Sequence, residues 1–527
     1  MNVRRLFFIL SLLAVVTTIL LTRFWSNAYS LFFFICPLIA LGVYDIVQRK
    51  HSILRIYPVI GHLRFIFESI RPEIQQYFVE SETSGQPINR EFRALVYQRA
   101  KGQRDTRPFG TVFDVYRNGY EWINHSLSPQ AVQASEPRIR FGSKQCSQPY
   151  DASALNISAM SFGALSRNAI MALNKGAKIG GFAHNTGEGG ISPYHLKYGG
   201  DLIWQIGTGY FGCRNKNGHF DEQLFAEQAS QEVVKMIEIK LSQGAKPGHG
   251  GILPAVKLTQ EIADIRHVPM GQDVISPASH STFSTPLELL QFVSKLRELS
   301  GGKPVGFKLC LGNKIEFLAI CKAMLETGIS PDFITIDGAE GGTGAAPIEF
   351  TNSIGTPLRD GLIFVHNALL GTGLRSSIRI IASGKALSAF HILRLLALGA
   401  DTVNIARGMM FSLGCIQSRH CNEDTCPVGV ATQNPVRYKA LDVNLKATRV
   451  ANYHSETIEN LMEIIAAAGL KSLEELRPWH INRRVGGTDV RNYAELYPQI
   501  SNKGLLTDSN MPKEWKRNWD QAASKSW

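Results

Sequence analysis

Two apolar runs open the sequence and predict a membrane hairpin. Leu6–Leu21 and Leu31–Tyr44 carry no charged residue, and each is close to the roughly 17–25 residues that span a bilayer. Basic residues precede the first run and follow the second, so both ends of the hairpin are expected on the cytoplasmic side. A cleaved signal peptide is the alternative, but the small-residue cleavage pattern is missing and the second run follows at once. Residues 1–50 are therefore expected to anchor the chain in the inner (cytoplasmic) membrane.

Residues 51–151 show a mixed pattern. Apolar residues at helical spacing after Pro58 predict an amphipathic helix, and residues 90–101 predict another. Aromatic and glycine residues from Phe109 to Trp122 indicate short strands or loops. No chemistry is recognisable here, so we expect this segment to connect the hairpin to the following domain and to pack on that domain.

Residues 152–435 alternate between short apolar runs of β type and helical patterns, and each run ends in glycine or small polar residues. Repeated βα units of this kind indicate a parallel sheet, and a closed (β/α)8 TIM barrel needs about 250 residues. A doubly wound sheet is the alternative, but no Gly-x-Gly-x-x-Gly follows a first strand. The expected strands include Ala154–Met160, Val233–Ile239, Asp273–Ile275, Val305–Cys310, Phe333–Ile336, Ile378–Ile381 and Thr402–Ile405, and the expected helices include Leu287–Leu299, Ile315–Thr327 and Ala389–Gly399.

Residues 436–527 predict a C-terminal helical extension. Ala440–Asn460 and Leu461–Ala468 have helical spacing, which is more typical of a packing face than of a site. A charged tail follows and is expected to be solvated or to contact another subunit.

The composition suits a globular α/β protein. The chain has 527 residues, 44% of them hydrophobic, and 47 glycines, which fits a TIM barrel with extensions and many tight turns. The formal net charge of +12 would suit nucleic acid, but the basic residues are dispersed and no RNA- or DNA-binding motif is present. Five of the eight cysteines are scattered singly, so no disulfide framework is expected.

Glycine-rich polar loops follow the predicted strands, where the chemistry of a TIM barrel lies. Glycine lets backbone N–H groups approach a flat ring or an anion closely. One such loop would be an ordinary turn, whereas several at successive strand ends indicate a binding site. These features are Ser158–Ser166, Asn185–Gly190, Gln243–Gly248, the strand residue Lys308, and Asp337–Gly344.

The last two predicted βα turns indicate a phosphate site. Ala382–Lys385 and Ala406–Gly408 each contain a basic residue and precede a helix, and the last two loops of this fold often bind phosphate through backbone N–H groups. The phosphate of FMN suits these turns, and a sugar-phosphate substrate would suit them equally well.

Cys415, Cys421 and Cys426 lie with gaps of five and four residues, and Pro427 follows the last of them. Closely spaced thiolates favour soft metal ions or iron–sulfur clusters. Structural zinc usually takes four ligands, and no fourth cysteine or downstream histidine pair follows. Three ligands suit a three-iron cluster; a chance grouping of buried thiols is the alternative.

The barrel region resembles the synthase domain of the glutamate synthase family. The matching motifs are Ala-Met-Ser-Phe-Gly-Ala-Leu-Ser, Gly-Glu-Gly-Gly, Gln-Gly-Ala-Lys-Pro-Gly, Ile-Ser-Pro, Gly-Gly-Thr-Gly-Ala and the cysteine loop ending Cys-Pro-Val-Gly-Val-Ala-Thr-Gln. The resemblance implies an oxidoreductase with FMN and a 3Fe-4S cluster. It also implies that 2-oxoglutarate and ammonia condense to 2-iminoglutarate, which takes hydride from reduced flavin to give L-glutamate.

By the same resemblance, Glu188, Lys246 and Arg266 match residues of the 2-oxoglutarate pocket, and Lys308 matches a lysine beside the flavin. Glu188, Lys246 and Lys308 are the expected catalytic residues. Charge alone also favours this assignment, because the two cations Lys246 and Arg266 would pair with the two carboxylates of 2-oxoglutarate. The flavin is expected to contact Met160, Ser161, Lys308, Gly341, Gly342, Ser383, Gly384, Lys385, Arg407 and Gly408.

Three positions depart from the family pattern: His249 stands for an acid, Ile252 for a polar substrate contact and Tyr210 for an arginine. A flavin oxidoreductase or transferase acting on another oxo acid or an N-substituted amino acid is therefore the alternative, and a non-catalytic membrane redox module is a third reading. Nitrogen is expected from free ammonia or a separate amidotransferase. Electrons are expected from a donor such as a ferredoxin or an NAD(P)H-dependent reductase, with the catalytic domain in the cytoplasm.

Overall fold

The first of two compact units begins with two apolar helices. The computed structural model describes residues 3–132, 136–507 and 511–527, and the chain divides into Met1–Arg90 and Glu91–Trp527. Helix α1 (Val3–Thr22) and the helical segment Ser26–Val47 are long and apolar enough to cross a membrane, by length and composition. Most of their side chains are not buried within the chain, so neither is a core helix of a soluble domain.

A buried carboxylate joins the helices of this first unit. Asp45, near the end of α2, is fully buried and accepts a 2.9 Å hydrogen bond from the backbone N–H of Val59. His62 Nε2 lies 2.9 Å from Asp45 Oδ1. These contacts tie the end of the second apolar helix to the segment that follows it. The helices of the unit after α1 are α2 (Phe32–Val47), α3 (Ser52–Ile56), α4 (Gly61–Ile74) and a π-helical turn, Gln75–Val79.

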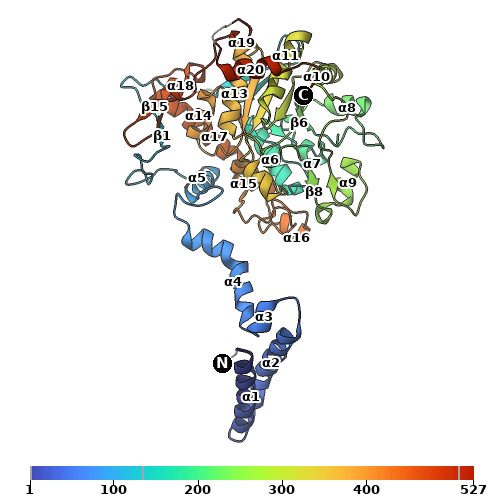
Figure 1. Cartoon of the computed structure of the whole chain (residues 1–527), viewed down its shortest axis with the longest axis vertical. Helices are drawn as coiled ribbons and strands as arrows, with labels where there is room; N and C mark the ends of the chain where they lie inside the picture. Colours follow the sequence, from blue (N-terminus) through green and yellow to red (C-terminus); the bar gives the residue numbers. More distant parts are fainter. Residues whose placement is uncertain (1–2, 133–135, 508–510) are drawn as a thin grey trace. The chain divides into compact units, whose positions relative to one another are not determined.

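The second unit is built around a closed barrel (Figure 1). Eight strands in the described part of the chain follow one another around it in sequence order, and every neighbouring pair is parallel. This confirms the predicted TIM barrel and excludes an open doubly wound sheet. The barrel strands are β4 (Leu155–Ile157), β5 (His184–Asn185), β6 (Leu202–Ile206), β7 (Val234–Lys240), β10 (Val305–Leu309), β11 (Phe333–Asp337), β12 (Arg379–Ser383) and β13 (Thr402–Ile405).

One expected strand is wrong and two were not foreseen. The expected strand Asp273–Ile275 lies outside the barrel, where β9 (Val274–Ile275) pairs antiparallel with β8 (Ile252–Leu253). Such a short apolar run carries no periodicity that separates a barrel strand from a loop hairpin. The two strands that were not expected are β5 and β6. Strand β5 is polar and only two residues long. Strand β6 is fully buried, but its run is short and lies between glycine-rich turns.

Helices cover the barrel, and the three that were expected between its strands are present. The expected helices at 287–299, 315–327 and 389–399 are confirmed as α10 (Pro286–Leu299), α11 (Lys314–Thr327) and α14 (Ala389–Ala397), and each is capped by a Thr, Asn or Ser side chain. The other helices of this unit are α5 (Arg90–Ala100), α6 (Arg167–Gly180), α7 (Pro193–Leu196), α8 (Glu222–Ala229), α9 (Gln260–Arg266), α12 (Ile348–Ser353), α13 (Leu358–Gly371), α15 (Arg407–Leu413), α16 (Pro435–Tyr438), α17 (Val443–Ala467), α18 (Tyr493–Leu496), α19 (Gly504–Thr507) and α20 (Lys513–Gln521).

The C-terminal extension contains one long helix where two were expected. α17 continues through the predicted break at Leu461 because neither proline nor glycine interrupts it. It packs along α6 (Figure 1).

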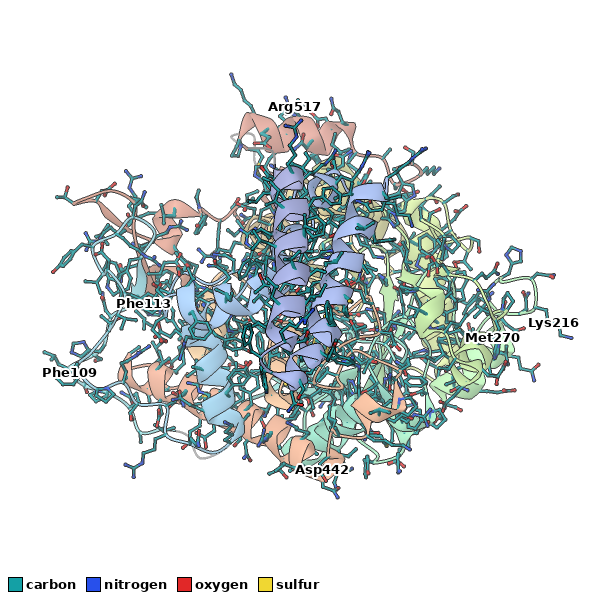
Figure 2. All side chains as sticks on the ribbon, turned by 90° about the horizontal axis from the view of Figure 1, so that it is seen from below. Phe109, Phe113, Lys216, Met270, Asp442 and Arg517 are labelled. Carbon is teal, nitrogen blue, oxygen red and sulfur yellow. The ribbon has the colours of Figure 1, made fainter. Side chains whose placement is uncertain are left out.

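In the same unit, the Phe109 loop and the Lys216 loop lie at opposite edges (Figure 2). Strand β1 (Glu121–Ile123) pairs with β14 (Ile481–Arg484), which pairs with β15 (Val490–Asn492).

A hairpin closes the amino-terminal end of the barrel. β2 (Arg138–Phe141) pairs with β3 (Tyr150–Ser153), and Phe141 stacks edge-on against Phe333 at 5.8 Å. Phe141 and Phe333 belong to one apolar core cluster with residues from the starts of several strands. The opposite end, where the strands finish, is left for the site.

Candidate active site

A cavity lies at the carboxyl ends of the barrel strands. It contains about 1310 Å³ of empty space, part of it open to solvent. Residues at or just beyond the ends of all eight strands line it, from Ser158 after β4 to Arg407 after β13. The glycine-rich loops that the sequence singled out therefore meet in one place, as the barrel geometry predicts.

One side of the cavity holds a carboxylate among three cations. Lys240 Nζ lies 2.7 Å from Glu188 Oε1, and both side chains are largely buried. Lys246 Nζ donates to the Gly250 carbonyl at 2.9 Å. Arg266 donates to the Phe162 carbonyl at 3.1 Å. The structure thus brings Glu188, Lys246 and Arg266 to the same cavity.

The pKa values of this group follow from burial and mutual charge. Burial alone would raise the pKa of Glu188, but Lys240, Arg266 and Lys246 hold it below its usual value. Burial, with the nearby Lys240 charge, lowers the pKa of Lys246 to about 8. Burial also lowers the pKa of Arg266 to about 10. With Glu188 ionised and with Lys246 and Arg266 protonated at neutral pH, the two cations outnumber the carboxylate, which favours an anionic ligand.

Glycine at two positions makes room for the Glu188 carboxylate. A side chain at Gly207 or at Gly251 would collide with its oxygens. Gly207 follows β6 and Gly251 belongs to the excursion after β7, so two loops close on the same carboxylate from different strands. The two glycines therefore leave the space that the Glu188 carboxylate occupies beside Lys240.

A second set of polar groups lies on the neighbouring strand ends. Lys308 Nζ lies 3.3 Å from Asp337 Oδ2, which also accepts the Gly244 N–H at 2.9 Å. Ser383 donates to Asp337 Oδ1 at 2.7 Å, and the Ser158 and Ser383 hydroxyls lie 3.1 Å apart. Burial by itself would lower the pKa of Lys308. The nearby Asp337 and Glu238 carboxylates outweigh burial, so the pKa of Lys308 is raised. Lys308 is therefore a fixed cation.

Basic residues from the last two turns line the far side of the cavity. Lys385 and Arg407 follow β12 and β13, which stand opposite β7 in the barrel. Met160, Ser161, Gly341, Gly342, Ser383 and Gly384 also line the cavity. Gly408 does not; it packs beneath Tyr453, where a side chain would meet the Tyr453 hydroxyl.

The cysteine loop reaches the rim of the cavity. Cys421 lines it, whereas Cys426 is buried beside it. Burial, with the neighbouring Cys421 and Cys426 thiols, raises the pKa of Cys415 to about 11, although Arg407 opposes the shift. Within residues 3–132, 136–507 and 511–527, no group of three His, Cys, Asp or Glu side chains is arranged to hold a metal ion.

A buried lysine ties the cysteine loop to the first barrel loop. Lys257 Nζ donates to the carbonyls of Ala164, Cys421 and Ala431 at 2.7, 3.2 and 3.2 Å. The side chain of Gln433 adds bonds to the carbonyls of residues 163 and 165 at 3.0 and 2.9 Å. The loop after β4 and the cysteine loop therefore form one hydrogen-bonded body.

We expect Lys257→Met to loosen this body. The change keeps the length of the side chain but removes three charge-assisted bonds, each worth roughly 1.5–3 kcal/mol. Limited proteolysis should cut the cysteine loop at least several-fold faster than in the wild type. Lys216→Met, at the exposed edge in Figure 2, is the control and should leave the rate unchanged; equal rates for both variants would remove Lys257 from this role.

Two of the three departures from the family pattern lie outside the main cavity. Ile252 lines it, His249 does not, and Tyr210 is buried behind it. His280 Nε2 lies 2.9 Å from the Lys240 carbonyl and therefore donates, so its Nδ1 accepts from the Tyr210 hydroxyl at 3.0 Å. Tyr210 thus supports the strand end that carries Lys240.

Sequence reasoning missed Lys240, Glu238 and Lys257. Lys240 directly follows the recognised run Val233–Ile239 and is the last residue of β7, so a lysine at a strand end was the available signal. Glu238 lies two residues earlier on the same inward face, where a carboxylate in an apolar run is unusual. Lys257 carried no signal, since its partners lie in loops distant in sequence.

The closed parallel barrel and its charged cavity define a TIM-barrel enzyme. The model of the conserved region in glutamate synthase matches residues 124–471. The chain belongs to the glutamate synthase family. Glutamate synthases are oxidoreductases that act on CH–NH2 donors, and the chain is an oxidoreductase of that class.

Individual relatives agree with this membership. The chain is 39% identical over 497 residues to the glutamate synthase large subunit-like protein YerD of Bacillus subtilis (strain 168), covering 86% of this chain and 94% of that one. It is 38% identical over 322 residues to the archaeal glutamate synthase [NADPH] of Methanocaldococcus jannaschii, covering 61% and 60%. The chain thus spans about three fifths of the archaeal relative's length.

Solved structures with a similar shape are distant in sequence. A mandelate oxidase variant is 12% identical with a TM-score of 0.40 and covers 81% of this chain and 96% of its own. A flavocytochrome b2 variant with benzoylformate is 11% identical with a TM-score of 0.42 and covers 85% and 93%.

Proposed function

We propose that the chain is an FMN- and iron–sulfur-dependent enzyme that reductively aminates 2-oxoglutarate, by way of 2-iminoglutarate, to L-glutamate. The observation that carries this proposal is the charge of one cavity: Lys246 and Arg266 on one side, Lys385 and Arg407 on the other, and only Glu188 and Asp337 as acidic lining residues. Two clusters of cations suit two anionic ligands, a dicarboxylate and a phosphate.

The far side of the cavity fits FMN. Lys385 and Arg407 would hold its phosphate beside the glycine backbone of the last two turns. Bound flavin would supply hydride. Lys308, kept cationic by Asp337, would stabilise negative charge on the ring. Ser383 holds Asp337 through its Oδ1 atom, and the Ser158 hydroxyl lies within hydrogen-bond distance of Ser383.

The residues around Glu188 would bind and orient the oxo acid. Lys246 and Arg266 would pair with carboxylates, and burial strengthens such pairs by excluding water. Glu188, held ionised by Lys240, would orient the incoming nitrogen through its carboxylate oxygens. Lys246 Nζ, with a pKa of about 8, would hold a proton near the oxo oxygen that leaves as water.

Cys415, Cys421 and Cys426 would hold a 3Fe-4S cluster that passes electrons to the flavin region. Three cysteine thiolates are a donor set that would suit an iron–sulfur cluster, and the bound cluster would supply one-electron transfer. The mutual influence of the thiols on the pKa of Cys415 and the place of Cys421 on the cavity rim support this assignment. A ferredoxin or NAD(P)H-dependent reductase would supply the electrons.

The two apolar helices of the first unit would anchor the enzyme in the inner membrane with the barrel in the cytoplasm. Their length and composition support this placement. Fractionation of cells should place the chain in the membrane fraction, and protease added outside the membrane should leave the barrel intact.

A second candidate substrate class follows from Ile252. It places an apolar wall in the cavity, and an apolar contact in place of a hydrogen bond changes selectivity between oxo acids. Comparing 2-oxoglutarate with oxo acids that carry apolar side chains would decide between the two. A higher kcat/KM for an apolar oxo acid would replace 2-oxoglutarate as substrate.

The direct test is anaerobic. The purified full chain should show flavin and iron–sulfur absorption, and the reduced form should be reoxidised when 2-oxoglutarate and ammonium are both added. Flavin and iron without reoxidation would keep the cofactors and exclude this substrate pair. A colourless protein after reconstitution would overturn the proposal.

Lys246→Ala should weaken 2-oxoglutarate binding by about 2–5 kcal/mol, as expected when a buried charge loses its partner. Because the cation binds the anion and its pKa is about 8, wild-type affinity should be full below that pH and fall as the pH rises through it. Lys246→Arg should remove this fall. Titration of the flavin spectrum with oxo acid measures both effects.

Lys295→Ala, on the exposed surface, is the matched control and should leave affinity and its pH dependence unchanged. An unaltered dissociation constant in Lys246→Ala would exclude Lys246 from the oxo-acid pocket.

A further inference from the structure

A small second cavity adjoins the main one. The centre of a water-sized molecule can occupy about 10 Å³ of this cavity. That space holds roughly one such molecule. Glu188 and Gly251 line both cavities and so lie where the two cavities meet. Thr208, Lys240 and His249 line only the smaller one.

His249 has a defined tautomer at this cavity. Its Nδ1 lies 3.1 Å from the Gly250 carbonyl, which can only accept. Nδ1 therefore carries the hydrogen, and Nε2 of the neutral ring keeps a lone pair. The ring is also held edge-on to Phe350 at 5.4 Å. The same Gly250 carbonyl accepts from Lys246 Nζ, so His249 and a residue of the oxo-acid pocket share one anchor.

We propose that this small cavity binds ammonia and that His249 Nε2 accepts the proton that ammonium loses on entry. The inference rests on the proposed amination and deepens it. Lys240 lines this cavity and its Nζ already lies 2.7 Å from Glu188 Oε1, which disfavours a second cation there, whereas neutral ammonia has the size of water and a lone pair for attack. The Glu188 carboxylate accepts several hydrogen bonds, so holding Lys240 leaves it capacity for an N–H of ammonia.

The condensation of ammonium with the oxo acid needs no further reactant. Ammonium gives one proton to His249 and becomes ammonia. The nitrogen lone pair forms a bond to the carbonyl carbon of the oxo acid, and the electrons of the carbon–oxygen π bond move to oxygen, giving a carbinolamine after proton transfer from nitrogen. Lys246 Nζ, which lines the main cavity, gives a proton to the hydroxyl group, which leaves as water and gives the protonated imine. The proton taken up by His249 then returns to Lys246, so no net proton is gained or lost.

His249→Asn tests the assignment in the full-length holoenzyme, with ammonium chloride as the nitrogen source. The KM for total ammonium should rise at least tenfold at neutral pH, the KM for 2-oxoglutarate should stay within twofold, and activity should recover as the pH rises and free ammonia becomes abundant. An unchanged KM for ammonium with an unchanged pH profile would overturn the role of His249.

His267→Asn is the matched control, because His267 Nδ1 also lies 3.1 Å from a backbone carbonyl, that of Arg214, but the side chain is exposed. It should behave as wild type. Methylamine tests the cavity itself: its extra methyl group exceeds the available room, so kcat/KM should fall at least 100-fold below that for ammonium in the wild type. Equal use of methylamine would overturn the ammonia cavity.

Assays of the wild-type enzyme and of His249→Asn together separate the ammonia cavity from the proposed amination. A wild-type enzyme that shows no amination with 2-oxoglutarate and ammonium overturns both. A wild-type enzyme that aminates while His249→Asn matches it in every measurement overturns only the inference.

Discussion

Cys421→Ser is expected to abolish the iron and acid-labile sulfide content of the purified chain while FMN stays bound. Serine is a poor ligand for iron in a cluster that prefers thiolates, and two remaining cysteines cannot hold three irons. Cys421 lies on the cavity rim, whereas the basic residues expected to hold the flavin phosphate lie on other strand ends. Iron analysis, sulfide analysis and the visible spectrum give the three readouts.

Cys36→Ser is the control for this prediction. Cys36 lies alone and exposed in α2, so its loss should leave iron and sulfide at the wild-type level. Normal iron content in Cys421→Ser would exclude the cluster assignment, and loss of flavin together with iron would show that the cysteine loop also supports the flavin site.

The second large effect concerns Glu238, a fully buried carboxylate in β7. It accepts hydrogen bonds from Asn185, Gln205 and Thr335 at 2.8, 2.6 and 2.6 Å. Glu238→Ala leaves three buried donors without their acceptor, and each such donor costs about 1–3 kcal/mol. The barrel should therefore lose roughly 3–9 kcal/mol of stability, measured by denaturant unfolding.

The buried Trp204, next to Gln205, gives an internal fluorescence signal for that unfolding. Glu238→Gln keeps one acceptor and should cost less than the alanine change. Glu222→Ala removes an exposed carboxylate paired with Lys295 and should change stability by at most about 1 kcal/mol. Similar losses in Glu222→Ala and Glu238→Ala would contradict the role given to the buried network.

The parts of the site that sequence reasoning could reach are those written in short motifs. Glu188 and Lys246 lie in glycine-rich runs, and barrel geometry brings the ends of distant strands together without knowledge of any contact. Periodicity also predicted the helices at 287–299, 315–327 and 389–399, whereas the break expected at Leu461 does not exist.

What sequence reasoning could not reach depends on contacts between segments far apart in the chain. The ammonium of Lys257 meets three carbonyls from two loops, and nothing at position 257 marks that arrangement. Tyr210 looked like a changed substrate contact, but its hydroxyl supports His280 behind the cavity. Strand β5 escaped notice because a polar pair, His184–Asn185, has no apolar run.

The hairpin that seals the amino-terminal end of the barrel has a kinetic consequence. With Phe141 and its cluster forming a floor, reactants and product share the rim at the other end. In the proposed reaction, the amino acid that would form there must depart before the next oxo acid can bind to Lys246 and Arg266. Product and oxo acid should therefore exclude each other, so the rate would respond to the ratio of the two pools as well as to either concentration.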